Sequence, residues 1–208
     1  MVLFIVFKNN INKCIVMKYE NALRTINKVT KNKNIKAIVN AVNDNQSKSK
    51  DWLVENLKPY ISLLNNPRIC VAAGWFCTIG EDLRKFTNNK IISFDKDRSC
   101  KRIGEIFNKD LNIKFQTKDI ENYNSSQFDV IVCSSCEHIS QKTLSDFLYV
   151  RKKGSLVVLQ SNNYHKIEEH INCKNSLNEF IADYNFDKIL YTGTLKLDTF
   201  ERYMIIAM

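Results

Sequence analysis

Several short apolar runs of this 208-residue chain are followed by residues that could bind a ligand. Gly74 follows the first run and begins a loop through Trp75 and Phe76. Glycine there allows the backbone to approach a ligand closely. Asp95 ends the second run, about 20 residues later, and a carboxylate at that spacing can accept both hydrogen bonds of a ribose diol. A solvated acid or a helix cap is the alternative interpretation of Asp95.

Two later segments carry further reactive groups. Asp119 and Ile120 follow the third run, where Asp119 also suits an ordinary loop. After the fourth run, Ser134 and Ser135 lead to a Glu-His pair. Glu137 or His138 could take a proton from a reacting group, although such a pair can also simply begin a helix. We therefore predict Glu137 and His138 as candidate catalytic residues.

The seven cysteines favour reduced thiols in a reducing compartment. Cys133, Cys136 and His138 could suggest a zinc site, but a second ligand pair at suitable spacing is missing and Cys133 should point into a sheet. We therefore expect no metal. A cytoplasmic protein without a membrane-spanning segment is expected, because no apolar run approaches the roughly 20 residues that cross a bilayer.

The elements that must position these residues alternate regularly after Pro67. Apolar runs predict strands and amphipathic stretches predict the helices between them. The strands are predicted over 69–73, 91–94, 113–116, 128–133, 155–159, 188–195 and 202–207. Continuous apolar strands alternating with helices indicate a parallel sheet covered on both faces. Too few residues lie between Leu195 and Tyr203 for a crossover helix, so the last two strands should pair antiparallel.

This order of elements resembles that of class I S-adenosylmethionine-dependent methyltransferases, whose seventh strand is inserted antiparallel. The resemblance implies a doubly wound, mostly parallel, seven-stranded α/β sheet with a terminal hairpin, a Rossmann-like fold, and S-adenosylmethionine as cofactor. An ordinary nicotinamide-binding fold, the alternative, lacks the terminal hairpin. The resemblance extends to small phage- or virus-encoded methyltransferase-like proteins. The cofactor-binding residues that it implies are Ala73, Gly74, Trp75, Phe76, Asp95, Lys96, Asp119, Ile120, Ser134 and Ser135.

The acceptor side of this expected site is formed after the fourth and fifth strands. The resemblance places Glu137 and His138 between the cofactor methionine and the acceptor. The amides of Asn162 and Asn163 and the phenol of Tyr164 could hydrogen-bond a substrate, and could equally form a polar turn.

The glycine motif is reduced in comparison with that family. Ala72 occupies the usual acidic position, and Phe76 and Thr78 replace later glycines. Cys136 does not match the nucleophile of pyrimidine C5 methyltransferases, because Ser135 stands in place of their proline. The segment also lacks the Asn/Asp-Pro-Pro-aromatic signature of amino-group methyltransferases that act on adenine or glutamine. A catalytically inactive scaffold or nucleic-acid-binding module is therefore the alternative to an active methyltransferase.

The first third of the chain is basic. Residues 1–68 contain 12 basic and 4 acidic side chains, whereas the other 140 contain 19 and 18. We predict a basic helical extension over 1–46, with Met17 as an alternative start, and the methyltransferase-like domain over 47–208. A polar loop is expected over 43–50, followed by a helix kinked or broken near Pro59. The charge favours nucleic acid slightly over a small molecule as the acceptor, and a nucleic-acid partner through residues 1–68.

Overall fold

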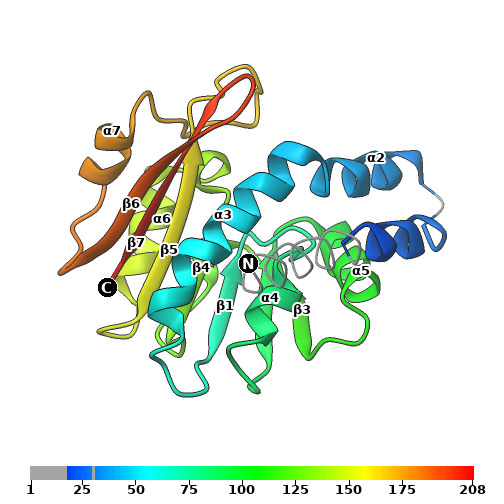
Figure 1. Ribbon diagram of the computed structural model, residues 1–208, viewed down its shortest axis with the longest axis horizontal. Coiled ribbons are helices and arrows are strands. Elements are labelled where there is room, and N and C mark those ends of the chain that lie inside the picture. The colour runs from blue at the N-terminus through cyan, green and yellow to red at the C-terminus, as the bar shows by residue number, and fades with distance from the viewer. Residues whose placement is uncertain (1–17, 30) are drawn as a thin grey trace, which may run out of the picture.

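The computed structural model describes residues 18–29 and 31–208. In this part of the chain, seven strands form one sheet in the order β3-β2-β1-β4-β5-β7-β6 (Figure 1). Strand β7 pairs antiparallel with both β5 and β6, so the predicted doubly wound sheet with an antiparallel terminal hairpin is confirmed. The strands are β1 (Ile69–Ala72), β2 (Ile91–Asp95), β3 (Ile113–Thr117), β4 (Val130–Cys133), β5 (Leu156–Asn162), β6 (Ile189–Lys196) and β7 (Glu201–Ala207).

Helices cover both faces of the sheet, and a further helical stretch over 18–26 precedes them. The α-helices are α2 (Asn32–Ala41), α3 (Asp44–Ile61), α4 (Gly80–Arg84), α5 (Arg98–Phe107), α6 (Gln141–Tyr149) and α7 (Leu177–Ala182). Two short 3-10 helices, η1 (Ile120–Asn122) and η2 (Cys136–His138), follow β3 and β4. None of the helices in these described ranges is both long enough and apolar enough to cross a membrane.

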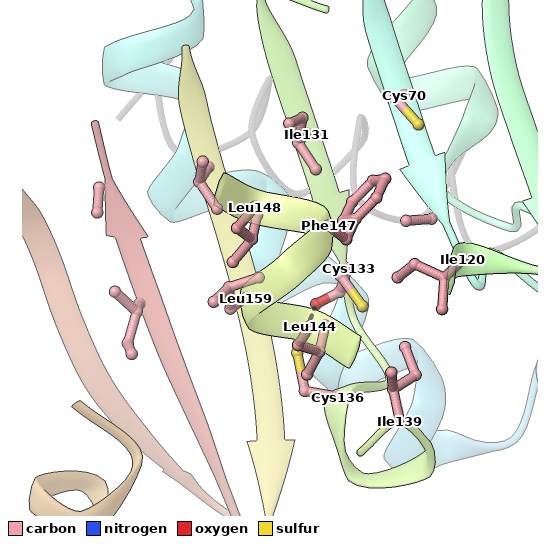
Figure 2. Packing of buried hydrophobic residues seen from close by; sticks show 14 of the residues in the cluster. Cys70, Ile120, Ile131, Cys133, Cys136, Ile139, Leu144, Phe147, Leu148 and Leu159 are labelled. Atoms are coloured by element: carbon pink, nitrogen blue, oxygen red, sulfur yellow. Dashed lines mark hydrogen bonds between the residues drawn. The ribbon is translucent and has the colours of Figure 1, made fainter. Parts of the chain in front are cut away.

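Alternation along the strands divides the core into two layers. In β1, Cys70 and Ala72 face the layer under α6 and α7, while Ile69 and Val71 face the layer under α3 and α4. Successive side chains of a strand point to opposite faces, so a strand that is apolar throughout can fill both layers. Figure 2 shows the first layer, where Phe147 and Leu148 of α6 pack over Ile131 of β4.

The segment before β1 differs from expectation over residues 43–50. The predicted loop over 43–50 is helical, because the Asn43 side chain caps α3 by accepting a hydrogen bond from the backbone N–H of Gln46 at 2.9 Å. Helix α3 continues through Pro59 to Ile61, so it is not broken there. Pro59 lies in the last turn, where one backbone hydrogen bond is lost without ending the packed helix. The predicted domain boundary after residue 46 therefore falls inside α3.

The N-terminal helices share a hydrophobic cluster with the main domain. Ala22 and Ile38 pack together with Phe76 of the glycine loop and with Ile103 and Phe107 of α5. Burial of this kind supplies most of the stability of a short amphipathic helix. The described part of the predicted extension is thus built onto the edge of the candidate site. Residues 1–17 of that extension lie outside the described residues.

Candidate functional site

The strand order places the predicted cofactor residues at one edge of the sheet. Strand β1 pairs with β2 on one side and with β4 on the other, so the order of strands reverses at β1. Ligands of doubly wound sheets bind at such a reversal, outside the carboxyl ends of the strands. Gly74, Asp95 and Ser134 all lie at these carboxyl ends. The structure therefore brings the three predicted segments to one place.

Gly74 is required by the packing of the loop that follows β1. Its N–H donates a hydrogen bond to the carbonyl of Phe94 at 3.0 Å, which continues the pairing with β2. A Cβ atom at Gly74 would lie 2.5 Å from Oγ of Ser93 and 2.9 Å from Cγ1 of Val71. No side chain fits between these neighbours unless one of them moves. Lack of space, rather than a left-handed backbone, explains the glycine.

We expect Gly74→Ala to lower the free energy of unfolding by about 1–3 kcal/mol, the usual cost of overpacking a buried site. Urea denaturation followed by circular dichroism measures this loss. The double variant Gly74→Ala/Ser93→Gly removes the Ser93 hydroxyl from the predicted collision and should recover part of it. A single variant as stable as the original chain would contradict the packing argument.

Left-handed backbone occurs instead at alternate residues beside Gly74. Ala73, Trp75 and Cys77 have φ angles of 46°, 48° and 51°. Such angles cost non-glycine residues of the order of 1–2 kcal/mol each, and they concentrate at ligand sites. The loop of this chain, which lacks the later glycines of the family motif, is thus strained at Ala73, Trp75 and Cys77.

Phe76 and Thr78, the residues that replace those glycines, do not have positive φ. The Phe76 side chain is buried against α5 and the N-terminal helices and stacks on Trp75, with ring centroids 4.9 Å apart. Of the predicted cofactor residue Phe76, only the backbone is therefore placed to contact a ligand.

Asp95 holds the strained loop in place. Its Oδ2 accepts a hydrogen bond from the backbone N–H of Trp75 at 3.1 Å, and its Oδ1 accepts one from the N–H of Asp97 at 3.0 Å. The residue that caps α5 is Asp97, whose side chain accepts from the N–H of Ser99. Asp95 is half-buried, and its neighbour Lys96 is exposed. The residue that caps a helix is thus Asp97 and not Asp95. The Asp95 side chain instead links the end of β2 to the Gly74 loop.

Asp119 and Ile120 lie after β3, on the same edge of the sheet. The Asp119 side chain caps η1 by accepting from the N–H of Glu121 at 3.2 Å. Ile120 is buried in the layer under α6, as Figure 2 shows. The loop character that the sequence left open for Asp119 is therefore observed, and its carboxylate lies at the surface.

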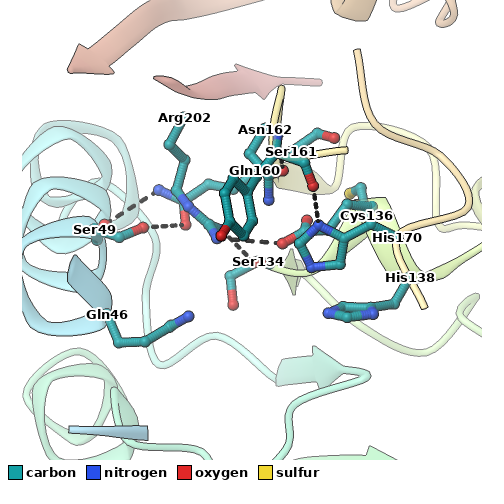
Figure 3. A network of polar contacts seen from close by, with 12 residues as sticks. Gln46, Ser49, Ser134, Cys136, His138, Gln160, Ser161, Asn162, His170 and Arg202 are labelled. Atoms are coloured by element: carbon teal, nitrogen blue, oxygen red, sulfur yellow. Dashed lines mark hydrogen bonds and ion pairs between the residues drawn. The ribbon is translucent and has the colours of Figure 1, made fainter. Parts of the chain in front are cut away.

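The segment after β4 contains a buried ion pair. Glu137 is 2% exposed, and its Oε1 lies 3.2 Å from Nη2 of Arg202 on β7. Nη1 of Arg202 also donates to the backbone carbonyl of Ser134 at 2.9 Å (Figure 3). This pair fixes the end of β4 against β7. Ser134 and Ser135 remain half-buried and His138 is exposed, so His138 is the more accessible of the two candidate catalytic residues.

The Cys136 thiol, just after β4, is buried and unsuited to nucleophilic attack. Cys136 is fully buried, and burial, together with the neighbouring Cys133, raises the pKa of its thiol well above the usual range. A thiol must ionise to act as a nucleophile. The structure therefore agrees with the exclusion of a Cys136 nucleophile on sequence grounds.

The predicted substrate residues after β5 are largely engaged in the protein itself. Asn162 is buried within β5, where its Oδ1 accepts from the N–H of Tyr164 at 2.8 Å. Asn163 pairs with Glu201 at the start of β7, and the Tyr164 ring packs on Phe200 at 5.2 Å between centroids. The side-chain oxygens of Asn162 and Asn163 thus both accept from backbone N–H groups of the chain itself. Nδ2 of Asn162 is buried without a hydrogen-bond partner in the described residues.

Lys50 is a further candidate site residue that the sequence did not reveal. It is half-buried on α3, with Nζ 5.9 Å from the centroid of the Trp75 ring and 3.4 Å from the carbonyl oxygen of Ala41. Burial, followed by the positive charges of Arg202 and Lys18, lowers the pKa of Lys50 to about 7. Its neighbour Ser49 is tied to Gln160 of β5, which holds α3 over the sheet (Figure 3).

A cavity of about 580 Å³ lies beside the N-terminal helices. Tyr19, Leu23, Ile26, Val39 and Val42 contribute much of its apolar wall. None of the predicted site residues lines it, so it gives no support to the cofactor assignment.

Solved structures with a similar fold include several methyltransferases. A SAM-dependent methyltransferase from Leishmania major superimposes with a TM-score of 0.64 at 12% identity, over 92% of this chain and 83% of that one. Magnesium protoporphyrin IX methyltransferase from Synechocystis with bound SAM gives 0.59 at 12% identity, over 91% and 89%. The N-methyltransferase NodS from Bradyrhizobium japonicum gives 0.61 at 9% identity, over 80% and 97%. No protein-family model and no curated protein sequence matches the chain. The chain thus has the class I methyltransferase fold.

Proposed function

We propose that this protein binds S-adenosylmethionine and transfers its methyl group to an acceptor. The observation that supports this most strongly is the Gly74 loop, which is hydrogen-bonded to Asp95 at the point where the strand order of the sheet reverses. The inserted antiparallel strand β7 and the similar structures, one of them with bound SAM, agree with it.

The residues at the sheet edge suit the parts of this cofactor. The backbone of Ala73 to Trp75 would contact the methionine portion, the Asp95 carboxylate would accept from the ribose hydroxyls, and Asp119 and Ile120 would border the adenine. When bound, the cofactor supplies an electrophilic methyl group on sulfonium. The protein contributes position and orientation, which matter greatly in an in-line displacement. His138, the exposed member of the catalytic pair, would accept the proton of the acceptor.

Lys50 is suited to bind the cofactor carboxylate. Burial and the positive charges of Arg202 and Lys18 lower the pKa of Lys50, which lies next to Trp75. An anionic ligand would therefore stabilise the charged form of this lysine. At pH 8 this lysine is mostly neutral in the free protein, and a carboxylate partner would raise its pKa. We therefore expect that binding of the cofactor is accompanied by the uptake of as much as about one proton. The affinity for the cofactor should fall as the pH rises above 7.

Calorimetry of S-adenosylhomocysteine binding at pH 8, in two buffers of different ionisation enthalpy, measures this proton uptake. The Lys50→Met variant should bind without it. Lys48→Met, on the exposed side of the same helix turn, should retain the uptake of the original chain. Equal uptake by Lys50→Met and the original protein would remove Lys50 from the carboxylate site.

Titration calorimetry with S-adenosylmethionine and S-adenosylhomocysteine tests the proposed function itself. Saturable binding of both is expected. A folded sample that binds neither at millimolar concentration would refute it. Incubation with methyl-labelled cofactor and separate RNA, DNA, protein and small-molecule fractions then identifies the acceptor class. Because residues 1–68 are strongly basic, we propose nucleic acid as the first fraction to examine.

A non-catalytic module with the same fold is the second candidate. The observation that favours it is Phe76, which fills the place of a motif glycine and is buried under the N-terminal helices. Cofactor binding without labelled product in any fraction would support this candidate, whereas label in one fraction would exclude it.

A further inference from the structure

Glu137, His138 and His170 form a cluster outside the cofactor-binding loops. One potential ligand atom from each residue lies within 4.8 Å of the others. Glu137 and His138 belong to η2, whereas His170 comes from the loop between β5 and α7. The two imidazole rings are 4.6 Å apart between centroids and nearly perpendicular. In Figure 3 the His138 and His170 rings lie side by side, and both point toward Ser134.

Backbone carbonyls orient both histidines. Nδ1 of His138 lies 3.1 Å from the carbonyl oxygen of Glu169, and Nδ1 of His170 lies 2.7 Å from that of Tyr164. A carbonyl oxygen only accepts, so each Nδ1 carries the proton. In the neutral ring the lone pair is then on Nε2. This is the arrangement in which a second hydrogen bond prepares a histidine to bind a metal ion.

The buried carboxylate supplies an independent sign of a missing ligand. Oε1 of Glu137 is paired with Arg202, but Oε2 is buried without any hydrogen-bond partner among the described residues. An unsatisfied buried carboxylate oxygen is costly and calls for a specific explanation. A cation bound between Oε2 and the two imidazoles would satisfy it.

We propose that Glu137, His138 and His170 bind a divalent first-row transition-metal ion such as Zn²⁺. Two imidazole nitrogens and one carboxylate oxygen suit such an ion, whereas Mg²⁺ and Ca²⁺ prefer oxygen ligands. Bonds of about 2.0–2.1 Å require the three ligand atoms to lie closer together than 4.8 Å, so binding would draw the exposed His138 side chain slightly toward Glu137 and His170. The proposal replaces the expectation that the chain binds no metal.

Three protein ligands would leave coordination positions open, as in catalytic rather than structural metal sites. A metal ion there can hold an acceptor oxygen and lower its pKa, which would assist removal of the acceptor proton. In the metal-bound protein His138 would serve as a ligand, and this effect of the metal would replace proton transfer to His138. This role, unlike the binding itself, rests on the proposed methyltransferase function. It suits an acceptor that carries a hydroxyl group.

The chain contains three histidines, and the third provides a matched control. After dialysis against a chelator, the full chain is titrated with Zn²⁺ by calorimetry and with Co²⁺ by visible absorption. About one equivalent should bind. His138→Ala and His170→Ala should each weaken binding by at least about 10–100-fold. His165→Ala, exposed on the same loop, should bind as the original chain does.

Absence of binding at 100-fold molar excess, or equal affinity in all three variants, would overturn the site. Loss of binding in His165→Ala to the same extent as in His170→Ala would also overturn it, since the metal would then be held elsewhere. His138 is exposed, so His138→Ala tests the proposal even if His170→Ala does not fold. Calorimetry with S-adenosylhomocysteine on the same samples separates a failure of the metal site from a failure of the cofactor site.

Discussion

An Arg202→Met variant is expected to lose about 3–5 kcal/mol of free energy of unfolding, the usual cost of leaving one member of a buried ion pair without its partner. Arg202 and Glu137 are 4% and 2% exposed, and Arg202 also binds the carbonyl of Ser134. Methionine fills a similar volume but leaves both the Glu137 carboxylate and the Ser134 carbonyl without their partner. Urea denaturation followed by circular dichroism measures the loss.

Two control variants give this result its meaning. The double variant Arg202→Met/Glu137→Leu should recover most of the stability, because apolar residues can replace a buried pair with little cost. Lys142→Met removes the exposed pair between Lys142 and Asp146 on α6, and should change stability by less than about 0.5 kcal/mol. If Arg202→Met and Lys142→Met have the same denaturation midpoint, the buried pair does not stabilise the fold.

Asp95→Ala is expected to weaken S-adenosylhomocysteine binding by about 10–100-fold. A hydrogen bond to a charged group contributes about 1.5–3 kcal/mol, and each 1.4 kcal/mol changes the dissociation constant tenfold. Part of this loss of affinity would be indirect, because the same carboxylate accepts the N–H of Trp75 and so holds the strained loop in its conformation. Calorimetry at a pH near 7 gives the dissociation constants of S-adenosylhomocysteine for the original chain and for Asp95→Ala directly.

Asp97→Ala is the matched control for Asp95→Ala. Asp97 lies two residues later and caps α5, so its loss should cost about 1 kcal/mol of stability and leave the affinity within about twofold. Asp95→Asn keeps the shape of the side chain and should fall between the original chain and Asp95→Ala. An unchanged affinity in Asp95→Ala would take Asp95 out of the cofactor site.

The elements that follow Pro67 could be predicted because each rests on local evidence. Helix α5 forms in the stretch between the second and third predicted strands, where a helix was expected, and the short span between Leu195 and Tyr203 correctly required an antiparallel pair. The failures lie where the tertiary structure overrides a local pattern. The polar segment 43–50 is helical because its buried side, including Ser49, packs against β5. Strand β5 continues through Ser161 and Asn162 because pairing with β7 satisfies their backbone.

The candidate site divides in the same way. Residues at strand ends, such as Gly74 and Asp95, could be predicted because parallel strands bring their carboxyl ends to one edge of the sheet. The partners of those residues could not, since each contact joins segments far apart in the chain. Arg202 reaches Glu137 across 65 residues, and His170 reaches His138 across 32.

The sequence by itself therefore determined the order and type of the elements and the strand ends that could carry a cofactor, because periodicity and short connections act locally. Only the tertiary structure decided that Glu137 is neutralised by Arg202, that Lys50 lies beside Trp75, and that two histidines meet. The physical reason is that these interactions depend on burial and on distances across the sheet. Neither quantity is encoded in the spacing of residues along the chain.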